Sequence, residues 1–319
     1  MAEAARVVCA GIVVADHVCT PIHHLPRAGE LVTADDLFLS TGGCASNAAV
    51  DLSKLGIRSR VCGRVGADVL GRFVRESLQE HNVDTSGLIT DPDRSTSQTL
   101  IVNVRGEDRR FVHSFGANGG FVVEDLDAVL DPVPAVLYFG GYLIMPSIDP
   151  VALAERFARL RAQGTITVLD VATPGRGNYL PQLRPVLPHT DVFLPNCDEA
   201  ELILGERDPV RQAEAFRALG ARRVVITLGD EGCVSISDSL RVRLGVFPMT
   251  FVDGSGGGDA FDAGYIAALL ENGDELRCLT LASAVGSSCV RSVGTTAGVF
   301  SREEAEDFVS RHTLPMRSI

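Results

Sequence analysis

Short apolar runs and helical patterns alternate along the second half of the chain. Runs rich in β-branched and other apolar residues predict strands at 165–169, 192–194, 224–228, 233–236 and 241–247. Between them, helical patterns at 151–163 and 210–219 stop at Gly164 and Gly220, because glycine closes a helix in the left-handed conformation at little cost. Strands that alternate with helices are typical of a parallel sheet with crossover helices, so the predicted fold class is α/β.

Two segments in the first half follow a different pattern. The runs at 97–104 and 109–114 are rich in β-formers and are joined by a short polar turn at 105–108, which predicts a hairpin rather than a crossover unit. The stretch 17–40 is also β-rich and is broken at Pro21, Pro26 and Gly29. We therefore expect a single domain over residues 1–319, with a small β-sheet lid built from segments near 12–40 and 96–115.

Composition narrows the class of ligand. The net charge of −12 and the pI near 5.0 argue against nucleic acid, because binding to a phosphate backbone depends on clustered positive charge. Lys54 is the single lysine, and its neighbours at 51–55 are interpreted as a helical surface. A GxxxxGK[ST] nucleotide site and a Schiff-base lysine are thereby excluded. Any phosphate must be held by arginine, metal or backbone amides.

The cysteines and the apolar runs indicate the compartment. Eight cysteines are scattered without CxxC spacing, so we interpret them as reduced core thiols rather than as a zinc site. No apolar run approaches the roughly 20 residues of a membrane span, and the first residues lack a signal-peptide pattern. We expect a cytoplasmic protein with no membrane partner.

A glycine-rich stretch carries the strongest chemical signal. An apolar run ends at Val252, the glycines 256–258 follow, and a helical pattern begins at once. Backbone N–H groups that are free of side chains at a helix start form an anion site. Asp259 at this start is interpreted either as a helix cap or as a general base that accepts the proton of an attacking hydroxyl. We expect the helix to place one apolar face on the core, with Phe261, Tyr265 and Leu269.

A second stretch, 40–56, enters a helix through the double glycine Gly42–Gly43, carries Asn47 in the first turn and closes at Gly56. Taken alone it reads as a tight strand-to-helix turn. Together the two stretches resemble the paired signatures of the ribokinase-like (PfkB) carbohydrate kinases, GGxxxNxA…LxxLG and DTxGAGDxFxxG. Three further segments are similar to that family's GxxGxDxxG, NxxE and TLGxxG motifs and occur in the same order, at 63–71, 196–199 and 227–232.

The resemblance implies a layered α/β/α sandwich with a β-sheet lid, and transfer of phosphate from ATP to a hydroxyl of a sugar-like molecule. It implies Asp259 as base, an anion hole at Gly256, Gly257 and Gly258, and substrate contacts from Asp16, Gly42, Gly43 and Asn47. It places the nucleotide at Asn196, Thr227, Gly229, Gly232 and Ser283, and Mg²⁺ near Asn196 and Glu199 through water. Many members also bind a monovalent cation such as K⁺, for which Asp253 and Ser255 match two positions. Lids of this kind pair across a homodimer in relatives.

Departures from the family pattern concern the substrate. Gly254 replaces the usual Thr of the second signature, and Gly257 stands at the small residue between the glycines of GAGD. Val14 stands where the ribose-specific members have Asn. Cys44 replaces the Lys of their GGK. Ribose itself is therefore in doubt, whereas the phosphoryl-transfer motif is intact. The alternatives are a nucleoside kinase of the same fold and an inactive nucleotide- or sugar-binding sensor. A dinucleotide oxidoreductase is disfavoured because no GxGxxG follows the first strand.

Other polar residues carry open interpretations. Arg109, Arg110 and His113 on the second hairpin strand are interpreted as a solvated lid surface, with contact to an acidic substrate or product phosphate as the alternative. Asp170 and Arg176 follow a strand, where ligand groups and turn caps are equally expected. Tyr142 is expected in the core.

Overall fold

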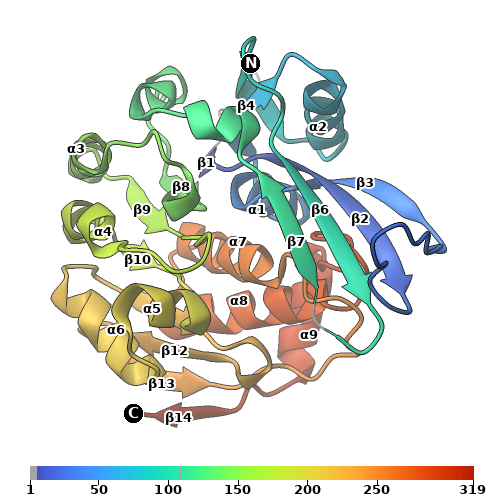
Figure 1. The fold of residues 1–319 in the computed structure, drawn as a ribbon. Coiled ribbons are helices and arrows are strands. Elements are labelled where there is room, and N and C mark those ends of the chain that lie inside the picture. The colour runs from blue at the N-terminus through green and yellow to red at the C-terminus, as the bar shows by residue number, and fades with distance from the viewer. Residues whose placement is uncertain (1–5, 108) are drawn as a thin grey trace.

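The computed structural model describes residues 6–107 and 109–319, and its main feature is a large twisted sheet between two layers of helices (Figure 1). Seven neighbouring strands are parallel, and three antiparallel strands extend one edge. Within the described residues the order is β14 (Met316–Ser318), β13 (Arg241–Leu244), β12 (Cys233–Ile236), β11 (Val224–Thr227), β10 (Val192–Phe193), β9 (Ile166–Leu169), β8 (Val136–Gly140), β1 (Val7–Gly11), β4 (Ser59–Gly66) and β5 (Asp84–Asp91).

The central strand β1 is buried on both faces, which is why it reads as an unbroken apolar run. Val7 and Cys9 face one core, whereas Val8 and Ala10 face the other. The first core lies under α1 (Cys44–Lys54), α2 (Val69–Glu80), α7 (Gly257–Leu270), α8 (Glu275–Cys289) and α9 (Arg302–Arg311). The second lies under α3 (Pro150–Ala162), α4 (Leu180–Val186), α5 (Cys197–Leu204) and α6 (Pro209–Ala218).

The predicted helices α3 and α6 are present and begin one residue earlier than the pattern indicated. Asp149 and Asp208 accept hydrogen bonds from first-turn N–H groups, and a proline occupies the first position of each helix. This combination satisfies amides that have no partner inside the helix. Gly164 and Gly220 follow the C-terminal ends with φ values of 92° and 110°, as expected of terminating glycines.

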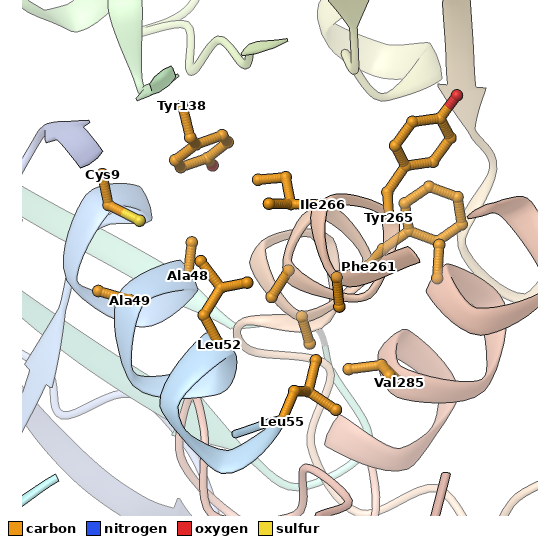
Figure 2. Packing of buried hydrophobic residues seen from close by; sticks show 14 of the residues in the cluster. Cys9, Ala48, Ala49, Leu52, Leu55, Tyr138, Phe261, Tyr265, Ile266 and Val285 are labelled. Atoms are coloured by element: carbon orange, nitrogen blue, oxygen red, sulfur yellow. The ribbon is translucent and has the colours of Figure 1, made fainter. Parts of the chain in front are cut away.

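The helix α7 is buried on all sides rather than on one face. Phe261, Tyr265 and Leu269 are buried as expected, but so is every other residue from Ala260 to Leu269. Figure 2 shows the reason: α1 lies on one side of this helix and α8 on the other, and Leu52 of α1, Ile266 of α7 and Val285 of α8 belong to one core. A helix that is apolar all round is an interior helix.

The expected surface position of 51–55 is wrong. Asp51 and Leu52 are fully buried, and neither carboxylate oxygen of Asp51 has a hydrogen-bond partner among the described residues. Lys54 is half-buried and donates to the carbonyl of Thr296. The segment belongs to the interface between α1 and the C-terminal part of the chain. The polar residues of 51–55 do not indicate this burial.

A second sheet of four strands stands off the main one, in the order β3 (Leu37–Gly42), β2 (Val14–Ile22), β6 (Gln98–Val104) and β7 (Arg110–Ser114) (Figure 1). The strands β6 and β7 pair as an antiparallel hairpin. The turn residue at 108 lies outside the described residues. The expected break at Pro21 is wrong, because β2 continues to Ile22. The pairing register shifts between Cys19 and Ile22, and such an irregularity accommodates a proline that cannot donate.

Where the structure describes the chain, we find no helix with both the length and the apolarity that a membrane crossing requires. The cysteines of the described part are all reduced, and those buried in it are Cys9, Cys19, Cys62, Cys233, Cys278 and Cys289.

Candidate active site

The first turn of α7 and the first turn of α1 meet, and this contact brings the two glycine-rich stretches together. Asn47 Nδ2 donates to Asp259 Oδ2 at 2.8 Å. Gly256 precedes α7 with φ 75°, and a Cβ there would lie 2.0 Å from the carbonyl oxygen of Thr295. Only glycine fits this close approach without strain. Asp259 therefore faces the interior of the site and not bulk solvent.

A cavity of about 480 Å³ opens beside this turn. Gly258 has no heavy atom of the described residues within 4 Å of where a Cβ would stand, and Gly257 has one only at 4.0 Å. The first-turn N–H groups of a helix have no intrahelical acceptor and can bind an anion. The predicted residues that line the cavity are Thr227, Gly229, Gly232, Gly257, Gly258 and Ser283. Its size is within the range of about 300–1,000 Å³ that is usual for small-molecule sites.

The predicted substrate residues lie on the other side of Asp259. Asp16, on β2, is 5% exposed, and a Cβ at Gly42 would lie 1.9 Å from its Oδ2. Gly43 caps α1 with φ 92°. Burial raises the pKa of Asp16 to about 6, and the charge of Asp259 adds to this effect while a hydrogen bond from Thr99 opposes it. A carboxylate so short of partners is suited to accept hydrogen bonds from hydroxyl groups.

The side chains of Cys44, Asp170 and Asp262 also gather around Asp259. Sequence patterns left the role of Asp170 open and did not indicate a site role for the other two. Ligand atoms of Cys44, Asp170 and Asp259 all lie within 4.8 Å of one another. Tyr138 Oη donates to Asp262 Oδ2 at 3.0 Å. The carboxylate of Asp170 accepts from the N–H of Gly141, as a turn cap does, and it also lies in this cluster, so both interpretations of Asp170 stay open. Cys44 carries no sequence signal beyond its place in the GGK position.

The acidic groups of this cluster are crowded together and shielded from water, which disfavours their charged forms. Burial, and then the charge of Asp259, raises the pKa of Asp170 to about 7. Burial, and then the charges of Asp170 and Asp259, raise the pKa of Asp262 well above its usual range. Burial keeps the Cys44 thiol protonated. Burial also raises the pKa of Asp259, while hydrogen bonds from Asn47 and Cys44 oppose the rise. Such crowded carboxylates favour a divalent cation close by, since Mg²⁺ prefers oxygen ligands.

Asn196 and Glu199 form a reciprocal cap at the start of α5. Asn196 Oδ1 accepts from the Glu199 N–H at 2.8 Å, and Glu199 Oε2 accepts from the Asn196 N–H at 3.0 Å. Asn196 also pairs with Thr227 across the ends of adjacent strands, and Thr227 lines the cavity. Desolvation, and next the Asp170 carboxylate, raises the pKa of Glu199 well above its usual range.

The hairpin of the lid reaches the loop before α7 through Arg109. Arg109 Nη1 donates to Ser255 Oγ at 2.5 Å and to Asp253 Oδ1 at 3.2 Å, so the solvated lid surface expected for Arg109 is wrong. Its neighbour Arg110 does pair at the surface, with Glu107. His113 faces the site and contacts the Thr99 hydroxyl. Arg176 is exposed, and Tyr142 is in the core as expected.

Known proteins resemble this chain in sequence and in fold. Residues 4–301 match the model of the pfkB family carbohydrate kinases. A ribokinase of Haemophilus influenzae is 25% identical over 305 residues, which cover 94% of this chain and 96% of that protein. A structure of Arabidopsis thaliana ribokinase complexed with ribose and ATP has a TM-score of 0.80 at 20% identity, covering 96% of this chain and 99% of the other. A putative ribokinase II from E. coli in complex with ATP and Mg²⁺ has a TM-score of 0.81 at 21% identity, covering 97% and 100%.

These likenesses confirm the predicted fold, a layered α/β/α sandwich with a small β-sheet lid, and they confirm the resemblance inferred from the motifs. The family model spans nearly the whole chain. The chain belongs to the pfkB family of carbohydrate kinases.

Proposed function

We propose that this protein transfers the γ-phosphoryl group of ATP to a hydroxyl of a sugar or sugar-like molecule, with Asp259 as the general base. The observation that carries the proposal is the position of Asp259. It stands in the first turn of α7 directly after the cavity-lining Gly257 and Gly258, is oriented by Asn47, and lies close enough to Asp16 for its charge to raise the pKa of that carboxyl. A hydroxyl bound at Asp16 would meet both a base and an anion site.

The environment of Asp259 suits proton transfer. A carboxylate whose pKa is raised by burial is a stronger proton acceptor than an exposed one. Asn47 donates to Oδ2 and thereby fixes the orientation of the carboxylate. As phosphorus approaches, negative charge develops on its oxygens, and the first-turn N–H groups at Gly256, Gly257 and Gly258 would stabilise that charge.

The nucleotide would occupy the cavity. Thr227, Gly229, Gly232 and Ser283 line it, and the absence of side chains at the glycines leaves room for phosphate and base. Mg²⁺ would be held through water near Asn196 and Glu199, and when bound it neutralises phosphate charge. ATP and Mg²⁺ are named for the E. coli structural relative, and the crowded carboxylates of this chain fit such an ion.

A panel of acceptors tests the proposal. We expect ADP release with ATP, Mg²⁺ and at least one sugar, sugar phosphate, sugar acid or nucleoside, with a phosphorylated product detectable by mass spectrometry. Substrate residues Asp16, Gly42, Gly43 and Asn47 predict an acceptor with vicinal hydroxyls. ATP binding without product from any acceptor would support the inactive sensor instead, and the loss of ATP binding as well would overturn both.

We further propose a homodimer through the lid of the single domain. In register across the lid, His17 on β2 stands between Leu39 and Leu100, and Leu100 pairs with Val112. This row lies on the face opposite Asp16, and Val112 is 67% exposed. An apolar row on an exposed sheet is typical of an interaction surface.

The dimer is checked by sedimentation in solution. We expect the wild type to sediment as a dimer and Val112→Glu as a monomer, because a charge in the apolar row opposes its burial. Val151→Glu, at another exposed valine on α3, is the control and should leave the dimer intact. A monomeric wild type at micromolar concentration would contradict the proposal.

A further inference from the structure

Arg109 joins the lid to the loop that leads into the anion site. It lies just before β7, on the face of the hairpin that carries His113 and Phe111, and the hairpin end reaches the segment before α7 (Figure 1). Its guanidinium bonds Asp253 and Ser255, which are distant in sequence. Both carboxylate and guanidinium are largely shielded, with side chains 9% and 25% exposed, so this ion pair is screened less than a surface pair.

The oxygen atoms that the family resemblance assigns to a monovalent cation already have donors. Asp253 Oδ1 accepts from the N–H and the hydroxyl of Ser255, both at 2.9 Å, as well as from Arg109. Asp253 Oδ2 accepts from the N–H of Gly294 at 3.0 Å. The carbonyl of Ser255 accepts from the Cys289 thiol at 3.2 Å. A cation at this point would compete with the guanidinium for the same oxygens, so the residues present do not fit a K⁺ site.

The guanidinium also stands where positive charge is scarce. Among the described residues that line the nucleotide cavity, Arg109 is the one basic side chain. Lys54 is directed to the Thr296 carbonyl. Cys44 stands where the ribose-specific members have the Lys of their GGK. Arg109 Nη2 lies 3.4 Å from where a Cβ of Gly254 would stand, so the guanidinium packs beside the glycine that replaces the family's usual Thr.

We infer that Arg109 is a positioning residue, a cation carried by the lid that takes the place of the monovalent cation and holds the 253–255 loop in the shape that forms the anion site. Its Nη1 contacts both the Asp253 carboxylate and the Ser255 hydroxyl, so a positive charge that is covalently fixed to the lid neutralises Asp253 and holds one loop. Formation of the anion site is thereby tied to the position of the lid. This inference rests on the proposed kinase function, because it assigns a requirement of the same site.

The test compares salts and variants. Wild-type ADP release, measured with the accepted substrate, should be equal in potassium chloride and in tetramethylammonium chloride at the same ionic strength. Arg109→Ala should lose about 10- to 100-fold in kcat, because a displaced anion site misplaces the phosphoryl group. Added guanidinium chloride should restore part of that loss, and Arg109→Lys should retain an intermediate rate. Arg110→Ala, on the opposite face of the hairpin, should match wild type and gain nothing from guanidinium.

Two results would overturn the inference: a wild-type rate that rises severalfold with K⁺, or an Arg109→Ala enzyme with the wild-type rate. ATP binding by calorimetry in the same two salts decides the matter independently of turnover. If wild type binds ATP equally in both salts but phosphorylates no acceptor, the proposed function fails while the salt independence of the site stands. If ATP binding itself requires K⁺, the role of Arg109 is wrong even for an active kinase. The salt comparison uses wild type, so it does not depend on the folding of any variant.

Discussion

Asp259→Asn is expected to abolish phosphoryl transfer while ATP still binds. The amide has the shape of the carboxylate and can keep the contact with Asn47, but it cannot accept the substrate proton. Loss of a general base alone costs about 10²- to 10⁴-fold in rate, and we expect the upper part of that range because no other described carboxylate shares the first turn of α7. Steady-state ADP release gives kcat, and calorimetry gives the Kd for ATP.

Asp262→Asn is the matched control for this variant. Asp262 lies on the same helix, is buried in the same cluster and accepts from Tyr138, so Asp262→Asn makes the same carboxyl-to-amide change in the same surroundings. We expect it to keep most of the wild-type rate, since its carboxylate is bonded to Tyr138 and not directed at the cavity. A near-normal rate for Asp259→Asn, on a substrate that the wild type accepts, would show that the proposed base is wrong.

Gly256→Ala is expected to damage both the anion site and the fold. The new Cβ would collide with the Thr295 carbonyl at 2.0 Å, and the residue would keep an unfavourable φ of 75°. The 254–258 loop must move to relieve this collision, and its N–H groups then no longer form the anion site. Removing one oxyanion donor costs about 10²- to 10³-fold in kcat. Strain of this kind also lowers the free energy of unfolding by about 1–3 kcal/mol. Urea unfolding and steady-state kinetics measure the two effects.

Gly164→Ala separates backbone strain from collision. Gly164 has φ 92° but nothing within 4 Å of its Cβ position among the described residues, and it closes α3 away from the site. We expect it to lose about 1 kcal/mol of stability from the left-handed conformation alone, with kcat unchanged. If Gly256→Ala behaved no differently in stability or rate, the close approach at Thr295 would have no importance for the anion site.

The secondary structure was predictable from the sequence wherever the chain carries residues that begin or end a helix. The helical pattern at 151–163 and the glycine after it placed α3 within one residue of its observed bounds. The burial of individual residues was not predictable from such local signals. Asp51 reads as a surface residue of α1, and α7 reads as a helix with one apolar face, yet both are interior. Whether a helix is covered on a second side depends on which distant helix packs there, and periodicity within one helix carries no information about that.

For the candidate site, the linear order of residues was enough to find the parts that act through the backbone. Glycines before a helix create open N–H groups wherever they occur, so Gly256, Gly257 and Gly258 could be located from spacing, and Asp259 with them. The electrostatic character of the site came only with folding. Cys44, Asp170 and Asp259 come from three separate segments, and Arg109 reaches Asp253 from the lid. Charge interactions and desolvation depend on distances in space, which only the packed chain sets.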